Sequence, residues 1–181
     1  MRRVAYDQKW TESWKNAHRY DELEIWGLTT PLSRGHAMAY QVRMDKTLEL
    51  ISAVVPREAR ILDIAAAQGN YSLRLAEMGY NVVWNDLREE FAGYVRLKHE
   101  YGRIDFCPGN AFEIAQDEEF DFVLIAEIIE HVAHPDDLVY FIEKATQSLP
   151  DCVSKRIFAN SASRFQKLLP SGTQQKNHHV Q

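Results

Sequence analysis

Residues Arg60–Asp86 read RILDIAAAQGNYSLRLAEMGYNVVWND, with two short apolar runs separated by a turn and a helical segment. The first run, Ile61–Ile64, is too short for a helix and too apolar for an exposed strand, so it predicts a buried parallel strand. The second run, Val82–Trp84, predicts another such strand, which leads to Asp86. Strand, turn, helix, strand and terminal acid in this order predict one half of a nucleotide-binding βαβ unit.

The turn predicted at Ala65–Gly69 carries small side chains, which let a ligand approach the backbone closely. Gly69 can adopt a positive φ without a steric penalty. We expect Asn70 to cap the helix that follows through Met78, and Gly79 to end it.

Asp86 places a carboxylate at the carboxyl end of a parallel strand, where open α/β sheets bind ligands and where a ribose diol is the natural partner. Two classes of cofactor site use this arrangement, and the spacing of glycines separates them. A dinucleotide fold needs G-x-G-x-x-G, whereas this turn has Ala65, Ala67 and Asn70 in those places. A nicotinamide-dependent oxidoreductase is therefore the weaker interpretation.

Asp63 through Gly69 resembles, in register, the first motif of the class I S-adenosylmethionine-dependent methyltransferases, an acid followed by alternating glycines. Ala65 and Ala67 replace two of the three glycines, and each added methyl group narrows the space for the methionine portion of the cofactor. The resemblance implies that Asp63 and Gly69 shape the cofactor loop and that Asp86 binds the ribose hydroxyls. The full set of cofactor-binding residues that it implies is Asp63, Ala65, Ala67, Gly69, Asp86, Leu87, Asn110, Ala111 and Ala126.

The resemblance continues downstream in the expected order. Ile104–Phe106 looks like the third strand, at a sheet edge where Pro108 is tolerable. Asn110 and Ala111 follow where these enzymes carry an acid or amide and a small residue beside the adenine, although an asparagine after a glycine is also a common turn residue. The stretch FDFVLIAEIIEHVAHPDDL, from Phe120, closely resembles the fourth strand of the family and the acid-histidine segment after it.

Methyl transfer requires little covalent chemistry from protein side chains, because the sulfonium of the cofactor is already an activated methyl donor. A base matters only for protonated acceptors. His131 is the candidate for removing a proton from a hydroxyl, with Glu127 or Glu130 orienting it or contacting the substrate. The alternative is that this segment starts a short helix with Glu130 and His131 exposed. A helix is expected from near Pro135 to Leu149.

Composition agrees with a single domain that has a real core: the chain has 181 residues and no apolar run that could span a bilayer. The net charge of −5 argues against non-specific nucleic-acid binding. Cys107 and Cys152 have no partners at metal-ligand spacing, so ordinary thiols in a reducing cytoplasm are expected, with no metal site. We expect neither nucleic acid nor membrane as a partner.

Aromatic residues crowd the segment 1–56, which we separate from a core at 57–160 and a polar tail at 161–181. Trp10, Trp14, Tyr20 and Trp26 could stack on a substrate or close a lid over a cofactor, or they could simply cover the edge or face of the sheet. In the resembled family, segments before the first strand help to choose the acceptor, which makes Tyr20, Trp26 and Arg34 candidates for that role.

The carboxyl-terminal part departs from the family pattern, in which a fifth strand is followed by an antiparallel pair. Ile157–Ala159 suits the fifth strand, but residues 161–181 lack two alternating apolar segments and predict a disordered tail. We therefore expect an α/β, Rossmann-like, doubly wound and mostly parallel sheet flanked by helices, lacking the last two strands and truncated at its end.

These features predict an S-adenosylmethionine-dependent methyltransferase whose acceptor is a small molecule. The acid-histidine segment resembles small-molecule methyltransferases and lacks the proline-rich tetrapeptide that many base-amine methyltransferases carry after the fourth strand. The alternative is a truncated, inactive fold that acts as a cofactor-binding or interaction module through its aromatic segment and an exposed sheet edge. The sequence leaves the acceptor atom and the oligomeric state open.

Overall fold

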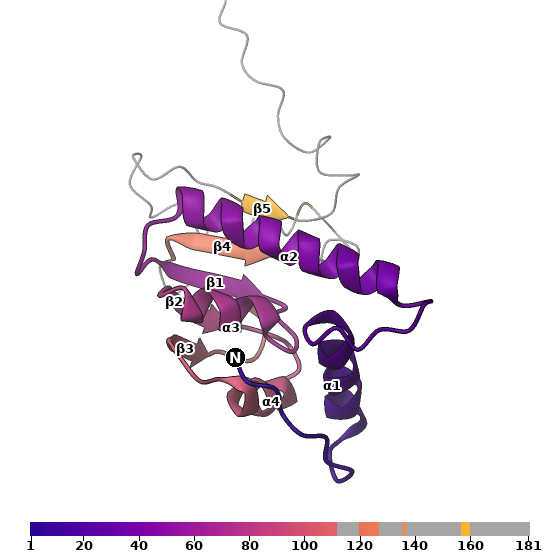
Figure 1. Cartoon of the computed structure of the whole chain (residues 1–181). Coiled ribbons are helices and arrows are strands. Elements are labelled where there is room, and N and C mark those ends of the chain that lie inside the picture. Colours follow the sequence, from indigo (N-terminus) through magenta and orange to yellow (C-terminus); the bar gives the residue numbers. More distant parts are fainter. Residues whose placement is uncertain (112–119, 127–135, 137–156, 160–181) are drawn as a thin grey trace, which may run out of the picture.

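The computed structural model describes residues 1–111, 120–126, 136 and 157–159 (Figure 1). Its helices are α1 (Glu12–Glu24), α2 (Arg34–Val54), α3 (Asn70–Glu77) and α4 (Glu90–Lys98). Its strands are β1 (Arg60–Ile64), β2 (Asn81–Trp84), β3 (Arg103–Phe106), β4 (Phe122–Ile125) and β5 (Ile157–Ala159). A strand is present at each of the five places where the sequence predicts one.

The strands form one sheet in the order β3-β2-β1-β4-β5, and every described pair is parallel (Figure 1). Leu62 at the centre of β1 lies opposite Val83 of β2 and Val123 of β4. Parallel strands are covered on both faces, which explains why these segments read as nearly continuous apolar runs. β3 lies at one edge of the described sheet, as predicted. The predicted Rossmann-like α/β architecture is confirmed.

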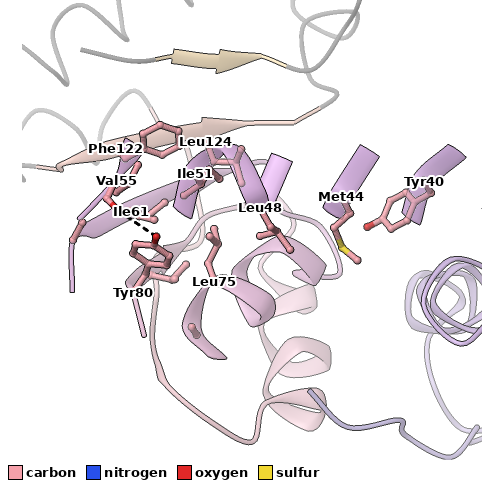
Figure 2. Packing of buried hydrophobic residues seen from close by; sticks show 13 residues of the cluster. Tyr40, Met44, Leu48, Ile51, Val55, Ile61, Leu75, Tyr80, Phe122 and Leu124 are labelled. Atoms are coloured by element: carbon pink, nitrogen blue, oxygen red, sulfur yellow. Dashed lines mark hydrogen bonds between the residues drawn. The ribbon is translucent and has the colours of Figure 1, made fainter. Parts of the chain in front are cut away.

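Helices α2 and α3 cover one face of the sheet. Leu48 and Ile51 of α2 pack with Leu75 of α3 and Ile61 of β1 in one buried cluster (Figure 2). The buried residues of α2 recur at three- and four-residue intervals, the spacing of a helix with one apolar face. This packing anchors α3, and with it the turn that precedes α3, to the centre of the sheet.

Two of the N-terminal aromatic residues, Trp10 and Trp14, pack against α4. The rings of Trp10 and Trp14 lie 5.8 and 5.7 Å from that of Tyr94. Trp14 donates a hydrogen bond from its indole nitrogen to the carbonyl of Glu90 at 2.8 Å, and it lies so close to Gly93 that a Cβ there would come within 2.8 Å of the indole. Of the two predicted alternatives, these two residues fit the packing role, since they lie against a buried cluster that includes residues of α4 and Trp84 of β2.

The opposite face of the sheet is equally buried. Leu62 and Val83 point to that face, at 0 and 1 % exposure. The helix predicted from Pro135 to Leu149 lies outside the described residues except for Asp136, which is helical, and so do the tail at 161–181 and the predicted loss of the last two strands. None of the helices in the described ranges is long and apolar enough to cross a membrane.

Candidate functional site

The carboxyl ends of three neighbouring strands bring most of the predicted cofactor-binding residues to one edge of the sheet. β1 leads into the turn at 65–69, β2 into Asn85 and Asp86, and β3 into residues 107–111. Helix α1 lies on the side toward which β1 and β4 point (Figure 1). In open α/β sheets this edge is where ligands bind.

The turn after β1, residues 65–69, carries three left-handed residues. Ala65, Ala67 and Gly69 have φ values of 53, 45 and 71°. A left-handed conformation costs a residue with a Cβ roughly 1–2 kcal/mol, so the two alanines occupy positions that favour glycine. Hydrogen bonds hold the turn in place, from the Trp84 indole nitrogen to the Ala67 carbonyl at 3.1 Å and from the Ala66 amide to the Asn85 carbonyl at 2.8 Å.

Gly69 is the N-terminal cap of α3, and the prediction that the Asn70 side chain caps this helix is wrong. A Cβ at Gly69 would come within 2.7 Å of Val95 in α4, so only glycine allows this close approach. The predicted end of the helix is confirmed, since α3 ends at Glu77 and Gly79 follows with a φ of 95°.

Asp63 lies buried at 2 % exposure and binds the start of α3. Its carboxylate accepts hydrogen bonds from the Ser72 hydroxyl at 2.6 Å and from the Ser72 backbone amide. Burial raises the pKa of Asp63 to about 7 against the lowering effect of these hydrogen bonds, and the nearby Asp86 carboxylate acts in the same direction as burial. Asp63 therefore shapes the turn by fixing the helix that follows it.

Asp86 is buried at 3 % exposure and is bonded directly to the turn. Its Oδ2 accepts a hydrogen bond from the Ala67 amide at 2.9 Å, and its Oδ1 accepts one from the Arg88 amide at 2.9 Å. The Arg88 guanidinium also contacts both carboxylate oxygens. Leu87 lies between Asp86 and Arg88 in the sequence and exposes 77 % of its surface, so its apolar side chain is open to solvent.

Hydrogen bonds of the Asn85 side chain hold the segment after β3 close to the end of β2. The side-chain amide of Asn85 donates to the carbonyls of Cys107 and Gly109 at 2.8 and 3.0 Å, and the Gly109 amide donates to the Asp86 carbonyl at 2.9 Å. Asn110 and Ala111 come next in the chain, the first exposed and the second half-buried. The structure thus places these two predicted residues directly after the segment that is bonded to Asp86, and it places Ala126, half-buried, directly after β4.

A buried polar network that the sequence did not predict joins the N-terminal segment to the turn. Lys98, 1 % exposed, donates to Asp21 Oδ2 and to Asn70 Oδ1, both at 2.7 Å. The Tyr94 hydroxyl donates to the same Asp21 oxygen at 2.8 Å, and the Asn70 amide donates to the Tyr40 hydroxyl at 3.2 Å. Burial lowers the pKa of Lys98, against the effect of Asp21. No local sequence pattern predicts an ion pair between residues that lie so far apart in the chain.

Tyr20 lines an open groove of about 780 Å³ between α1 and residues 28–33, together with Leu23 and Leu28. Trp26 is half-buried and Arg34 is exposed, and neither lines this groove. Tyr20, Trp26 and Arg34, the three residues predicted to select the acceptor, therefore do not line one common groove.

Glu127, Glu130 and His131, the predicted catalytic residues, lie outside the described residues. Within the described ranges, no three histidine, cysteine or acidic side chains converge in a way that could hold a metal ion.

A family described as a methyltransferase domain matches residues 61–151 of the chain. YqeM of Bacillus subtilis (strain 168), a protein named as a methyltransferase without a stated acceptor, is 35% identical over 99 residues, which cover 51% of this chain and 40% of YqeM. The ubiquinone biosynthesis O-methyltransferase of Aromatoleum aromaticum (strain DSM 19018 / LMG 30748 / EbN1) is 32% identical over 127 residues, which cover 63% of this chain and 54% of that protein. The chain thus spans about half the length, or less, of these relatives.

Among solved structures, the magnesium protoporphyrin IX methyltransferase (ChlM) of Synechocystis PCC 6803 with bound S-adenosylhomocysteine superposes with a TM-score of 0.57 at 17% identity. The superposition covers 75% of this chain and 63% of ChlM, and at this identity it shows the fold alone. The family match, by contrast, covers both strands of the βαβ unit and the turn between them. The chain therefore belongs to the methyltransferase domain family and has the Rossmann-like fold of class I S-adenosylmethionine-dependent methyltransferases.

Proposed function

We propose that this chain binds S-adenosylmethionine at the carboxyl edge of the sheet and transfers its methyl group to an oxygen atom of a small-molecule acceptor. The observation that carries the cofactor part is the hydrogen bond from the Ala67 amide to Asp86, because it links the turn and the strand-end acid into one unit. The oxygen acceptor is supported by the relatives named as ubiquinone biosynthesis O-methyltransferases.

The residues of this edge suit the separate parts of the cofactor. Asp86 offers carboxylate oxygens to the ribose hydroxyls. The turn at 65–69, with its small side chains, would lie against the methionine portion, while Asp63 fixes the helix that follows the turn. Leu87, Asn110, Ala111 and Ala126 would frame the adenine.

When bound, S-adenosylmethionine supplies an activated methyl group on a sulfonium, so the protein mainly has to orient the acceptor and exclude water. A hydroxyl acceptor also has to lose a proton. We assign that step to His131, because histidine is the residue type suited to proton transfer at neutral pH, with Glu127 or Glu130 orienting its ring or contacting the acceptor.

Calorimetric titration of the chain with S-adenosylmethionine and S-adenosylhomocysteine tests the proposal. We expect micromolar binding, and we expect Asp86→Ala to weaken it by about 1–3 kcal/mol, the scale of a hydrogen bond to a charged group. Asp86→Asn, which retains an acceptor for the Ala67 amide, separates loss of ribose binding from disturbance of the turn.

Asp105→Ala is the matched control, because it removes a half-buried carboxylate, paired with Arg103, from the neighbouring strand β3. Unchanged affinity in folded Asp86→Ala would remove Asp86 from the site, and no binding by the folded wild type would refute the cofactor assignment. In a second arm, transfer of a labelled methyl group to a small-molecule fraction is expected, and label found only in protein or nucleic acid would contradict the acceptor class.

A further inference from the structure

The hydrogen-bonding capacity of the Asp86 carboxylate is already filled. Oδ1 accepts from the Arg88 amide at 2.9 Å and from Arg88 Nε at 3.0 Å. Oδ2 accepts from the Ala67 amide at 2.9 Å and from Arg88 Nη2 at 3.4 Å. A carboxylate has about four acceptor positions, two on each oxygen, so two further donors can bind only if two of the present ones leave.

The four donors differ in their freedom to leave. The amides of Ala67 and Arg88 belong to the backbone of the turn and of the strand end, and hydrogen bonds of neighbouring residues fix that backbone, as between the Ala66 amide and the Asn85 carbonyl. The guanidinium stands at the end of a side chain that is 55% exposed, whereas the Asp86 side chain is only 4% exposed. In this same position the guanidinium also lies 4.4 Å from the ring centroid of Phe91, while its exposed side chain leaves it free to turn toward solvent.

We propose that Arg88 competes with the ribose hydroxyls of the cofactor for Asp86 and thereby sets the affinity of the site. This inference rests on the proposed function, because it takes Asp86 as the residue that binds the ribose. The ribose diol brings two hydroxyl donors, the number of positions that the guanidinium vacates when it swings out. Arg88 is thus an affinity-determining residue of the cofactor site, and it opposes binding.

The first test is the affinity of Arg88→Gln for S-adenosylhomocysteine, measured by calorimetry. Loss of the competing ion pair should tighten binding roughly fivefold, the upper range for a partly exposed pair. Arg96→Gln removes a comparable exposed guanidinium from α4, where it stacks on Phe106, and should leave the affinity unchanged. In an Asp86→Asn background the gain from Arg88→Gln should largely disappear, as in a double-mutant cycle of coupled residues.

A second measurement separates competition at Asp86 from a general effect of charge. Adenosine is uncharged and carries the ribose diol, whereas 2′,3′-dideoxyadenosine lacks it. We expect Arg88→Gln to gain affinity for adenosine alone. An equal gain for both nucleosides, or unchanged or weaker binding of S-adenosylhomocysteine by folded Arg88→Gln, would overturn the inference while leaving the cofactor site intact. If neither the wild type nor Arg88→Gln binds any of these ligands, the proposed function fails and the inference fails with it.

Discussion

Asp63 is a residue whose surroundings change its protonation between pH 4 and pH 7. Its carboxyl group is buried and has a pKa of about 7, against 3.8 for an ordinary aspartate. The folded state therefore holds a proton that the unfolded state releases. The resulting contribution to stability is complete below about pH 4 and is lost as the pH rises to about 7, by about 1.4 kcal/mol per pH unit.

We expect this loss to vanish in Asp63→Asn, whose neutral amide can still accept the hydrogen bond from Ser72. The measurement is the free energy of unfolding of both proteins in urea from pH 4 to pH 7.5, with Asp105→Asn as a more accessible acid for comparison. As the pH rises, the free energy of unfolding of Asp63→Asn should increase steadily relative to that of the wild type. A difference that is constant across this range would show that Asp63 is charged in the folded state throughout.

At the scale of elements, the junction of β1 and α3 combines one favourable and two unfavourable choices of residue. Ala67 has a φ of 45°, so Ala67→Gly should relieve about 1–2 kcal/mol of left-handed strain. Part of this gain is offset, by roughly 0.5–1 kcal/mol, because glycine loses more freedom on folding. We expect the free energy of unfolding to rise by about 1 kcal/mol or less, measured by urea denaturation.

Ala66→Gly is the matched control for Ala67→Gly, since Ala66 is flanked by the two left-handed alanines and is not itself left-handed. It should lower stability. Gly69→Ala should lower it further, because its Cβ would meet Val95 at 2.7 Å in a left-handed conformation. Equal effects of the Ala66 and Ala67 substitutions would mean that the turn relaxes without strain at Ala67.

At the scale of the whole molecule, the network around Lys98 connects all four described helices. It joins Asp21 of α1, Asn70 of α3 and Lys98 of α4, and Asn70 extends it to Tyr40 of α2. Because the ion pair is buried, Lys98→Met should destabilise the fold by about 3–5 kcal/mol, leaving the Asp21 carboxylate uncompensated.

The double variant Lys98→Met/Asp21→Asn removes both charges and should recover much of this loss, since apolar or neutral replacement of a whole buried pair is often tolerated. Thermal and urea unfolding of the single and double variants measure the recovery. A double variant no more stable than Lys98→Met would show that the shape of these side chains, and not their charge, accounts for the contribution of the network to stability.

The sequence predicts the parts of this molecule that depend on neighbours in the chain. Apolar runs such as Ile61–Ile64 are recognisable because a central parallel strand is buried on both faces. Ala65 and Ala67 could be placed in the turn because Asp63 through Gly69 resembles the first motif of the methyltransferase family, and their positive φ values agree with that register.

Contacts between distant segments were not predictable in this way. Asn70 has the side chain of a helix cap, yet Lys98 and Tyr40 bind it, and neither partner lies near it in the sequence. Arg88, by contrast, stands two residues after Asp86, so its contact with the carboxylate was within reach of local reasoning. The assignments to Glu127, Glu130 and His131 stay predictions, since these residues lie outside the described ranges.

The hydrogen bond between the Trp84 indole and the Ala67 carbonyl gives the molecule a built-in optical reporter. Trp84 is fully buried at the end of β2, two residues from Asp86, and its indole touches the turn that we assign to the cofactor. The emission of an indole depends on its hydrogen bonds, so a ligand that shifts this turn would alter Trp84 fluorescence. With Trp10, Trp14 and Trp26 replaced by phenylalanine, Trp84 would be the one remaining tryptophan, and its fluorescence would report whether the site is occupied.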